Sequence, residues 1–353
     1  MHKETNGSRR VIVPPQQYSR PVLLNASGCL DALTAPDVAR SLDGFVTKTV
    51  TPLPRGGNAP VRIAETDVGM LNSIGLANPG RDRFLAETLP RLRRLGVPLW
   101  VSVGGFAAAE YADTCALLAD VTIELNLSCP NVDEAPESAG EIVAACRAST
   151  DLPLYAKLSP AAWDVAETAR AVEAAGADGL SLVNTIRGLA LDERTLRPRL
   201  GTAVGGLSGP ALRPIALAAV WACYRAVSIP IVGMGGVASG RDALELIAAG
   251  ATAVALGTVL FSDPEAPARI RRELAAEAAA RGFENPAEAR GTAHGDDRSL
   301  DERSRVEAEK ALEFGPNLPL DPRDSGASIP RRGPAEDASP SAGPVAGSAH
   351  GRT

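Results

Sequence analysis

The stretch Glu124-Leu125-Asn126-Leu127-Ser128-Cys129-Pro130-Asn131 places amides and a thiol around a proline, directly after the apolar run 121–125. That run has the length of a buried β-strand, and Pro130 cannot extend it because proline lacks the backbone N–H that a sheet needs. Proline also restricts Cys129 to extended or turn geometry. Taken alone, Cys129 is better explained as a small buried hydrophobic residue beside turn-capping asparagines.

The other apolar runs of the chain end in the same way, in glycine, serine, threonine, lysine or asparagine. Predicted helices alternate with them, and this alternation is typical of a (β/α)8 TIM barrel, an α/β fold. A doubly wound open sheet is the alternative, but its strand ends would not converge on one site. The predicted strands are 22–28, 44–49, 98–103, 121–125, 152–158, 179–183, 229–232 and 253–256. The predicted helices include 36–42, 82–95, 136–149, 161–175, 264–282, 286–289 and a long helix that opens at Gly205-Gly206-Leu207-Ser208-Gly209-Pro210.

Other segments depart from the barrel pattern. Residues 1–20 read as an N-terminal arm, and the barrel is expected over 21–294. Residues 72–80 are expected to form a loop, and 191–200 alternate like a hairpin inserted into the barrel. Residues 295–353 are rich in charge, proline, glycine and serine, so a disordered C-terminal tail is expected there, with a solvated helix over 301–314.

Composition excludes several classes of function. A net charge of −6 with interspersed arginines disfavours a nucleic-acid partner. No apolar segment is long enough to span a membrane, so a soluble cytoplasmic protein is expected. The cysteines at 29, 115, 129, 146 and 223 lack metal-site spacing, so we expect no metal site and no iron–sulfur cluster held by this chain alone. The histidines are His2, His294 and His350, all outside the predicted core, so histidine catalysis has almost no candidates.

The strand ends indicate an anionic, flat ligand. Glycines follow the last two strands, at 233–236 and at 257, where barrels of this kind commonly bind phosphate. Lysine is rare in this chain, yet Lys48 and Lys157 each close a strand, and a buried ammonium needs an anionic or polarisable partner. A neighbouring carboxylate could be that partner, but Glu124 is the only obvious acid on the adjacent strand runs, so a ligand is favoured. The asparagines at 72, 126, 131 and 184 suit a heterocycle with alternating N–H and C=O groups. These features favour a flavin mononucleotide or a phosphorylated substrate.

Together these motifs resemble the dihydroorotate dehydrogenases. The resemblance runs from residue 22 to 289 and rests on 72–76, 124–131, 157–160, 184–185, 205–210 and 233–236, in the family's order. Cysteine at position 129 resembles the soluble class, since the membrane-bound class uses serine there. Residues 184–192 and 205–210 are more similar to the branch that reduces NAD through a second subunit carrying FAD and [2Fe–2S] than to the fumarate-using homodimers.

The resemblance implies FMN-dependent oxidation of dihydroorotate to orotate in the biosynthesis of UMP, with Cys129 as the base and a homodimeric core in a heterotetramer. It implies that orotate contacts Lys48, Asn72, Ser73, Ile74, Gly75, Leu76, Asn126, Asn131, Asn184 and Thr185. It implies that FMN contacts Ser27, Lys48, Thr49, Ser102, Asn126, Lys157, Val183, Gly209, Gly235, Gly236, Gly257 and Thr258. Ser102 departs from the family pattern, which usually places asparagine beside the flavin.

Other functions stay open at this point. A dihydropyrimidine dehydrogenase-like reaction and a tRNA-reducing dihydrouridine synthase share the barrel, although the acidic charge disfavours RNA and Asn131 favours orotate. A redox-inactive phosphate-binding barrel or a partner scaffold belongs to a different class. Flavin bound to the purified protein distinguishes the enzyme from that last class.

Overall fold

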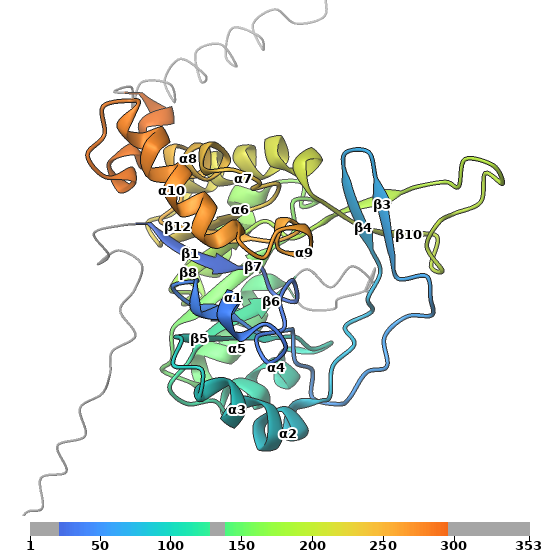
Figure 1. Ribbon diagram of the computed structural model, residues 1–353. Helices are drawn as coiled ribbons and strands as arrows, with labels where there is room; N and C mark the ends of the chain where they lie inside the picture. The colour runs from blue at the N-terminus through green and yellow to red at the C-terminus, as the bar shows by residue number, and fades with distance from the viewer. Residues whose placement is uncertain (1–20, 128–137, 296–353) are drawn as a thin grey trace, which may run out of the picture. The chain divides into compact units, whose positions relative to one another are not determined.

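A computed structural model describes residues 21–127 and 138–295, which fall within one compact unit. Eight parallel strands follow the order β1-β12-β11-β8-β7-β6-β5-β2 (Figure 1). This parallel order with helices between the strands confirms the predicted barrel. The strands are β1 (Val22–Asn25), β2 (Phe45–Val46), β5 (Leu99–Val103), β6 (Thr122–Asn126), β7 (Leu154–Leu158), β8 (Gly179–Leu182), β11 (Ile231–Met234) and β12 (Ala253–Leu256).

A buried asparagine helps to close the ring between its first and last strands. Leu24 of β1 forms a parallel bridge to Gly44, just before β2. The Asn25 side chain then takes the place of a backbone ladder: its amide donates to Val46 O over 2.8 Å, and its Oδ1 accepts from Val46 N over 2.8 Å. Because Asn25 is fully buried, these hydrogen bonds are shielded from water and join β1 to β2.

The helices pack around the ring, and their bounds differ from the predicted ones mainly at the ends. The predicted helix over 82–95 consists of three pieces with a π-helical middle. The helices are α1 (Pro36–Arg40), α2 (Arg81–Arg83), η2 (Phe84–Thr88), α3 (Leu89–Arg93), α4 (Ala108–Cys115), α5 (Ala139–Ser149), α6 (Val165–Ala174), η3 (Pro210–Leu212), α7 (Arg213–Ala226), α8 (Gly240–Ala248), α9 (Val259–Ser262), α10 (Ala266–Ala279), η4 (Pro286–Ala289) and η5 (Thr292–His294).

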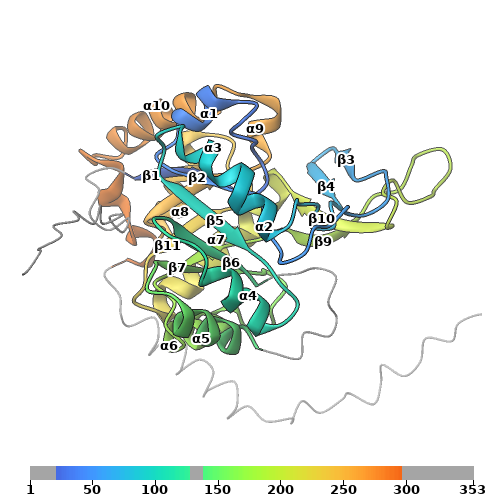
Figure 2. The same cartoon turned by 90° about the horizontal axis from the view of Figure 1, so that it is seen from below.

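A second sheet stands beside the ring at the carboxyl ends of the strands, as the two views show (Figures 1 and 2). Its antiparallel strands are β3 (Ile63–Thr66), β4 (Gly69–Asn72), β10 (Val204–Ser208) and β9 (Ile186–Leu189), in that spatial order. The inserted excursion is confirmed, but its paired strands flank the predicted range 191–200. The predicted helix start at Gly205 is wrong, because Gly205 to Ser208 belong to β10, but the helical turn with Pro210 at its start is present and leads into the long helix over 213–226. Residue 72, predicted to begin a loop, ends β4.

The inside of the ring is filled by large side chains opposite glycine and alanine. Trp100 and Tyr155 lie with ring centroids 4.5 Å apart. A Cβ atom at Gly179 would lie 2.2 Å from the Tyr155 ring, so only glycine leaves room for that tyrosine. Met234 completes this inner cluster with valine, leucine and alanine residues. The filled interior gives the strand ends above it a rigid floor.

The predicted arm lies outside the described residues, as does the tail except for Gly295. Among the helices that the structure describes, none is long and apolar enough to cross a membrane.

Candidate active site

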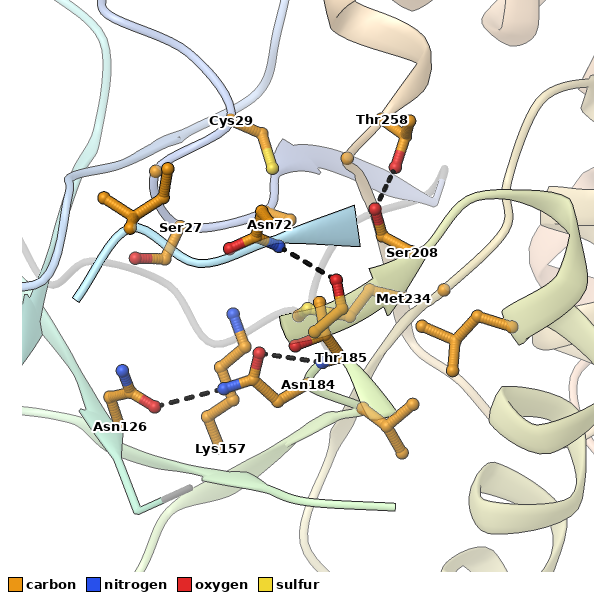
Figure 3. Close-up of a pocket in the computed structure, with 18 of the residues that line it drawn as sticks. Ser27, Cys29, Asn72, Asn126, Lys157, Asn184, Thr185, Ser208, Met234 and Thr258 are labelled. Atoms are coloured by element: carbon orange, nitrogen blue, oxygen red, sulfur yellow. Dashed lines mark hydrogen bonds between the residues drawn. The ribbon is translucent and has the colours of Figure 1, made fainter. Parts of the chain in front are cut away.

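A cavity of about 1000 Å³ lies over the carboxyl ends of the barrel strands. The barrel contributes Lys48, Asn126 and Lys157 to its lining, and the second sheet contributes Met70 and Asn72. Figure 3 shows Asn72, Asn126 and Lys157 converging from different strands. The volume is at the upper end of the range for small-molecule sites, which leaves space for a cofactor and a substrate together.

Lys157 forms a buried ion pair beneath the cavity. Its Nζ lies 3.6 Å from Glu124 Oε1, and the two side chains are 6% and 1% exposed. Lys157 nevertheless lines the cavity, whereas Glu124 does not. From the sequence, the partner of this lysine could be a carboxylate or an anionic ligand. In the structure the partner is the carboxylate of Glu124, and the ammonium still lies at the cavity wall.

Lys48 approaches the cavity beside a thiol. A Cβ atom on Gly28 would lie 3.1 Å from Lys48 Nζ, which places the ammonium against the turn that carries Cys29. Burial lowers the pKa of Lys48, and the charge of Lys157 lowers it further, while Cys29 acts in the opposite direction. Burial also raises the pKa of the Cys29 thiol, against the opposing charges of Lys157 and Lys48. Loss of solvation is therefore the largest influence on the pKa of both groups.

A chain of amides and hydroxyls crosses the strand ends. Asn184 Nδ2 donates to Asn126 Oδ1 over 3.2 Å, and Asn184 Oδ1 accepts from Thr185 N over 2.8 Å (Figure 3). Asn126 Nδ2 donates to Thr49 Oγ1 over 3.2 Å. The hydroxyl of Tyr111 donates to the Asn126 backbone carbonyl over 2.8 Å. These hydrogen bonds fix the amide orientations before any ligand binds.

Two further polar residues, Asn58 and Thr202, hold the loop after β4. Asn58 Nδ2 donates to Ser73 Oγ over 2.7 Å. The Thr202 hydroxyl lies 2.6 Å from Ser73 Oγ and 2.9 Å from the Val204 carbonyl oxygen. Thr202 is the donor to Ser73, so Ser73 Oγ accepts from both Asn58 and Thr202. Ser73 is thus held from both sides.

Glycines and hydroxyls form another side of the cavity. Gly209 and Gly236 have positive φ angles of 95° and 74°, and a Cβ atom at Gly236 would lie 2.9 Å from Gly209 O. Thr258 Oγ1 donates to Ser208 Oγ over 2.9 Å. In Figure 3 this hydroxyl pair lies apart from Lys157 and Asn126. Bare backbone and hydroxyls suit a phosphate, while the lysines and amides suit a polar heterocycle.

The structure brings together nearly all of the site residues expected from the sequence. Ser102 is the exception: it is fully buried and its hydroxyl lies 3.0 Å from Thr49 Oγ1, so it supports a cavity residue without lining the cavity. Cys129 and Asn131 lie outside the described residues. The residues that line the cavity as expected are Ser27, Lys48, Thr49, Asn72, Ser73, Ile74, Gly75, Leu76, Asn126, Lys157, Val183, Asn184, Thr185, Gly209, Gly235, Gly236, Gly257 and Thr258.

Several lining residues were missed by sequence reasoning. Cys29 follows a strand end directly, so the strand-end pattern was a usable signal for it. Asn58 precedes β3 and Tyr111 lies in α4, and neither position carries such a signal. Their places depend on long-range packing.

Residues 10–277 match the family model described as dihydroorotate dehydrogenase. The catalytic subunit of dihydroorotate dehydrogenase B (NAD(+)) from Desulforudis audaxviator is 44% identical over 264 residues, which are 72% of this chain and 86% of that protein. A protein from Solibacter usitatus named putative dihydroorotate dehydrogenase A (fumarate) is 45% identical over 66% of this chain and 81% of its own.

Among solved structures, dihydroorotate dehydrogenase from Eimeria tenella in complex with ferulenol superposes with a TM-score of 0.64 at 23% identity. The match covers 77% of this chain and 85% of that one, and it shows the shared fold. The family model covers most of the chain, and the named relatives share more than two fifths of the aligned residues. The chain belongs to the dihydroorotate dehydrogenase family.

Proposed function

We propose that the protein oxidises dihydroorotate to orotate in pyrimidine biosynthesis, with FMN as its cofactor. Members of this family are flavoproteins. The observation that carries the proposal is the meeting of Lys48, Lys157 and the strand-end asparagines in one cavity that also has a glycine-lined side. Such a cavity matches a flat polar ring linked to a phosphate.

The proposed FMN site uses the expected residues except Ser102, which acts through Thr49. Gly209, Gly235, Gly236, Gly257 and Thr258 would hold the phosphate, and Lys157 and Asn126 would face the ring. FMN, when bound, supplies the acceptor for the hydride of dihydroorotate. Lys157 favours negative charge on the ring because its ammonium stays at the cavity wall.

The proposed substrate site consists of the loop 72–76 and the amides around it. Asn126 and Asn184 present donors and acceptors whose orientations are already fixed by the 3.2 Å bond between them. Lys48 supplies a positive charge for the orotate carboxylate. Dihydroorotate would then be oriented by groups that need little rearrangement, which is how a preorganised site lowers an activation barrier.

Cys129 is the proposed base that removes the proton from a ring carbon of the substrate. Its place in the sequence supports this role, because it follows Asn126 by three positions at the end of β6. Among the described residues, His294 donates from Nε2 to Ala249 O over 2.9 Å, so it is not available for this step.

The proposed electron acceptor is NAD, reached through a second subunit with FAD and a [2Fe–2S] cluster. The names of several relatives include the term catalytic subunit, which supports a partner. The named relatives of both branches have similar identities of 44% and 45%, so the preference for NAD rests on the motifs 184–192 and 205–210. We also propose a homodimeric core and the cytoplasm as the compartment.

The purified protein tests this proposal. It should contain FMN, and anaerobic dihydroorotate should bleach its absorbance with release of orotate. The matched control is dihydrouracil, which lacks the carboxylate and should react at least tenfold more slowly. Turnover with fumarate is then compared with turnover with NAD, and the NAD assay is run with and without a co-expressed second subunit. This comparison identifies the electron acceptor. A colourless protein that takes up no FMN, or bleaching by dihydrouracil alone, would overturn the proposal.

A further inference from the structure

Glu124 occupies a position where a carboxylate is energetically costly. Its side chain is 1% exposed inside the ring, and among the described residues Oε1 has no hydrogen-bond donor. Removing a carboxylate from water costs several kcal/mol unless nearby charge compensates. The compensating charge is the Lys157 ammonium 3.6 Å away. The two residues come from neighbouring strands, where Asn126 is the direct partner of Lys157 and Glu124 lies one inward-facing position below.

The charges around this pair are unequal. Lys48 and Lys157 line the cavity at the barrel strand ends, whereas no described lining residue is a carboxylate. Glu124 is therefore a buried acid beneath the positively charged Lys48 and Lys157 of the cavity. Its electrostatic influence reaches the cavity, because its charge raises the pKa of Cys29 while Lys157 and Lys48 lower it, with burial as the largest cause.

We propose that Glu124 is a positioning residue that holds the Lys157 ammonium against the cavity wall and sets the positive charge that a bound ligand meets. The flavin part of this proposal rests on the proposed function, and the part that concerns the empty cavity does not. Removing the carboxylate leaves Lys48 and Lys157 without the negative charge of Glu124. The cavity should then bind anionic groups more tightly.

The substitution Glu124→Gln tests the charge because glutamine keeps the volume and an oxygen that can accept from Lys157. The reduction potential of the bound flavin should become more positive, with the ratio of affinities for reduced and oxidised FMN rising roughly tenfold, equivalent to one pKa unit. Glu173→Gln is the matched control: Glu173 accepts from Ser228 N and Oγ over 2.8 and 2.6 Å on the outside of the barrel. It removes the same charge and should leave the potential unchanged.

A second readout needs neither flavin nor activity. Cys29 is partly exposed and lines the cavity, so its alkylation by iodoacetamide in flavin-free protein, followed by peptide mass spectrometry, reports its ionisation separately from Cys129. The pH of half-maximal labelling should fall in Glu124→Gln. Glu124→Asp keeps the charge, so its midpoint should stay near the wild-type value. If the protein binds no flavin, the proposed function fails while this measurement still decides the role of Glu124.

An unchanged Cys29 midpoint in a folded Glu124→Gln variant overturns the proposal, and so does an equal fall in Glu124→Asp, because a charge effect must distinguish the two substitutions. An unchanged flavin potential with a shifted Cys29 midpoint would restrict the influence of Glu124 to the empty cavity, which contradicts its proposed role toward the ligand.

Discussion

Asn58 holds Ser73 and its neighbour at two points: its side-chain amide donates to Ser73 Oγ over 2.7 Å, and its backbone N–H donates to Ile74 O over 3.1 Å. Gly75 makes this approach possible, since a Cβ atom there would lie 2.4 Å from Asn58 Oδ1. The loop is therefore positioned by a residue that precedes β3 and that itself lines the cavity.

We expect Asn58→Ala to weaken orotate binding because it frees Ser73 on one side. A lost hydrogen bond of this kind is worth about 1 kcal/mol, so the dissociation constant should rise roughly five- to tenfold. Spectral titration of the bound flavin measures it. Asn285→Ala, which removes a comparable bond to Ala287 N over 2.9 Å in η4, should leave binding unchanged. Equal affinity in the two variants would contradict the role of Asn58.

Lys48 should make the ligand-free protein less stable at neutral pH than it would be with an apolar residue. Burial lowers the pKa of Lys48 in the folded state, whereas the unfolded chain titrates near 10.4. Between the two values the unfolded chain binds more protons, so the free energy of unfolding rises with pH across that window. Lys48→Met should stabilise the flavin-free protein at pH 7, abolish orotate binding, and flatten that rise in urea denaturation.

Lys157→Met is the contrasting variant, because it leaves Glu124 buried without its cation and should destabilise the protein by about 3 kcal/mol. Stabilisation by both substitutions, or by neither, would show that the two lysines do not differ as their surroundings indicate.

Gly257→Ala should lower FMN affinity with little effect on folding. A Cβ atom at Gly257 would meet Ala26 Cβ and Cys29 Sγ at 3.7 and 3.8 Å, which are ordinary contacts. Gly236→Ala is the comparison, since its φ is 74° and the added atom would lie 2.7 Å from Arg213 Cβ. We therefore expect the unfolding temperature of the flavin-free protein to be unchanged in the first variant and lowered in the second. Fluorimetric FMN titration should detect a loss of FMN affinity in both.

Truncation after residue 315 should leave flavin content and turnover unchanged, because the removed residues have little apolar content. Truncation after residue 284 should instead lower the unfolding temperature by several degrees. It removes His294, which stacks on Trp221 at 5.2 Å, and Arg290, which lies 5.6 Å from the Tyr224 ring centroid. A loss of FMN in the shorter deletion would show that the tail contributes to the site.

Cys129→Ser should slow flavin reduction by dihydroorotate by a factor on the order of 10² to 10⁴, the usual contribution of a general base. A free thiol titrates near 8.5, so the wild-type rate should rise with pH as the thiol ionises. Orotate binding should persist because Asn126 and Asn184 remain. Stopped-flow spectroscopy across pH decides the matter: a serine variant with the wild-type rate and profile excludes Cys129 as the base.

The barrel could be predicted from the sequence because each strand is a short apolar run. The site could be predicted because Asn126, Lys157 and Asn184 lie at or just beyond the carboxyl ends of strands β6, β7 and β8. The second sheet could not be predicted in the same way. Gly205 and Gly206 resemble a helix entry because Pro210 follows, but Gly206 serves in β10, where a Cβ atom would lie 2.1 Å from Thr185 Oγ1. That requirement exists only in the folded chain.

The ion pair between Lys157 and Glu124 was considered from the sequence and set aside in favour of a ligand. The alternation of strand side chains puts both residues on the inner face, but the parallel register that places them within 3.6 Å becomes known only from the structure.

The second sheet also constrains the order in which the protein folds. Asn72 Nδ2 donates to Gly206 O across 134 positions of the chain, and four of the eight ring strands, β5 to β8, lie between those residues. Closing so long a loop early is entropically unfavourable, so strands β4 and β10 should meet only after the ring has brought them near each other. The second sheet, which lines the cavity, would then be the last part to assemble and the first to open, so the proposed cofactor could enter a newly made chain before that sheet closes.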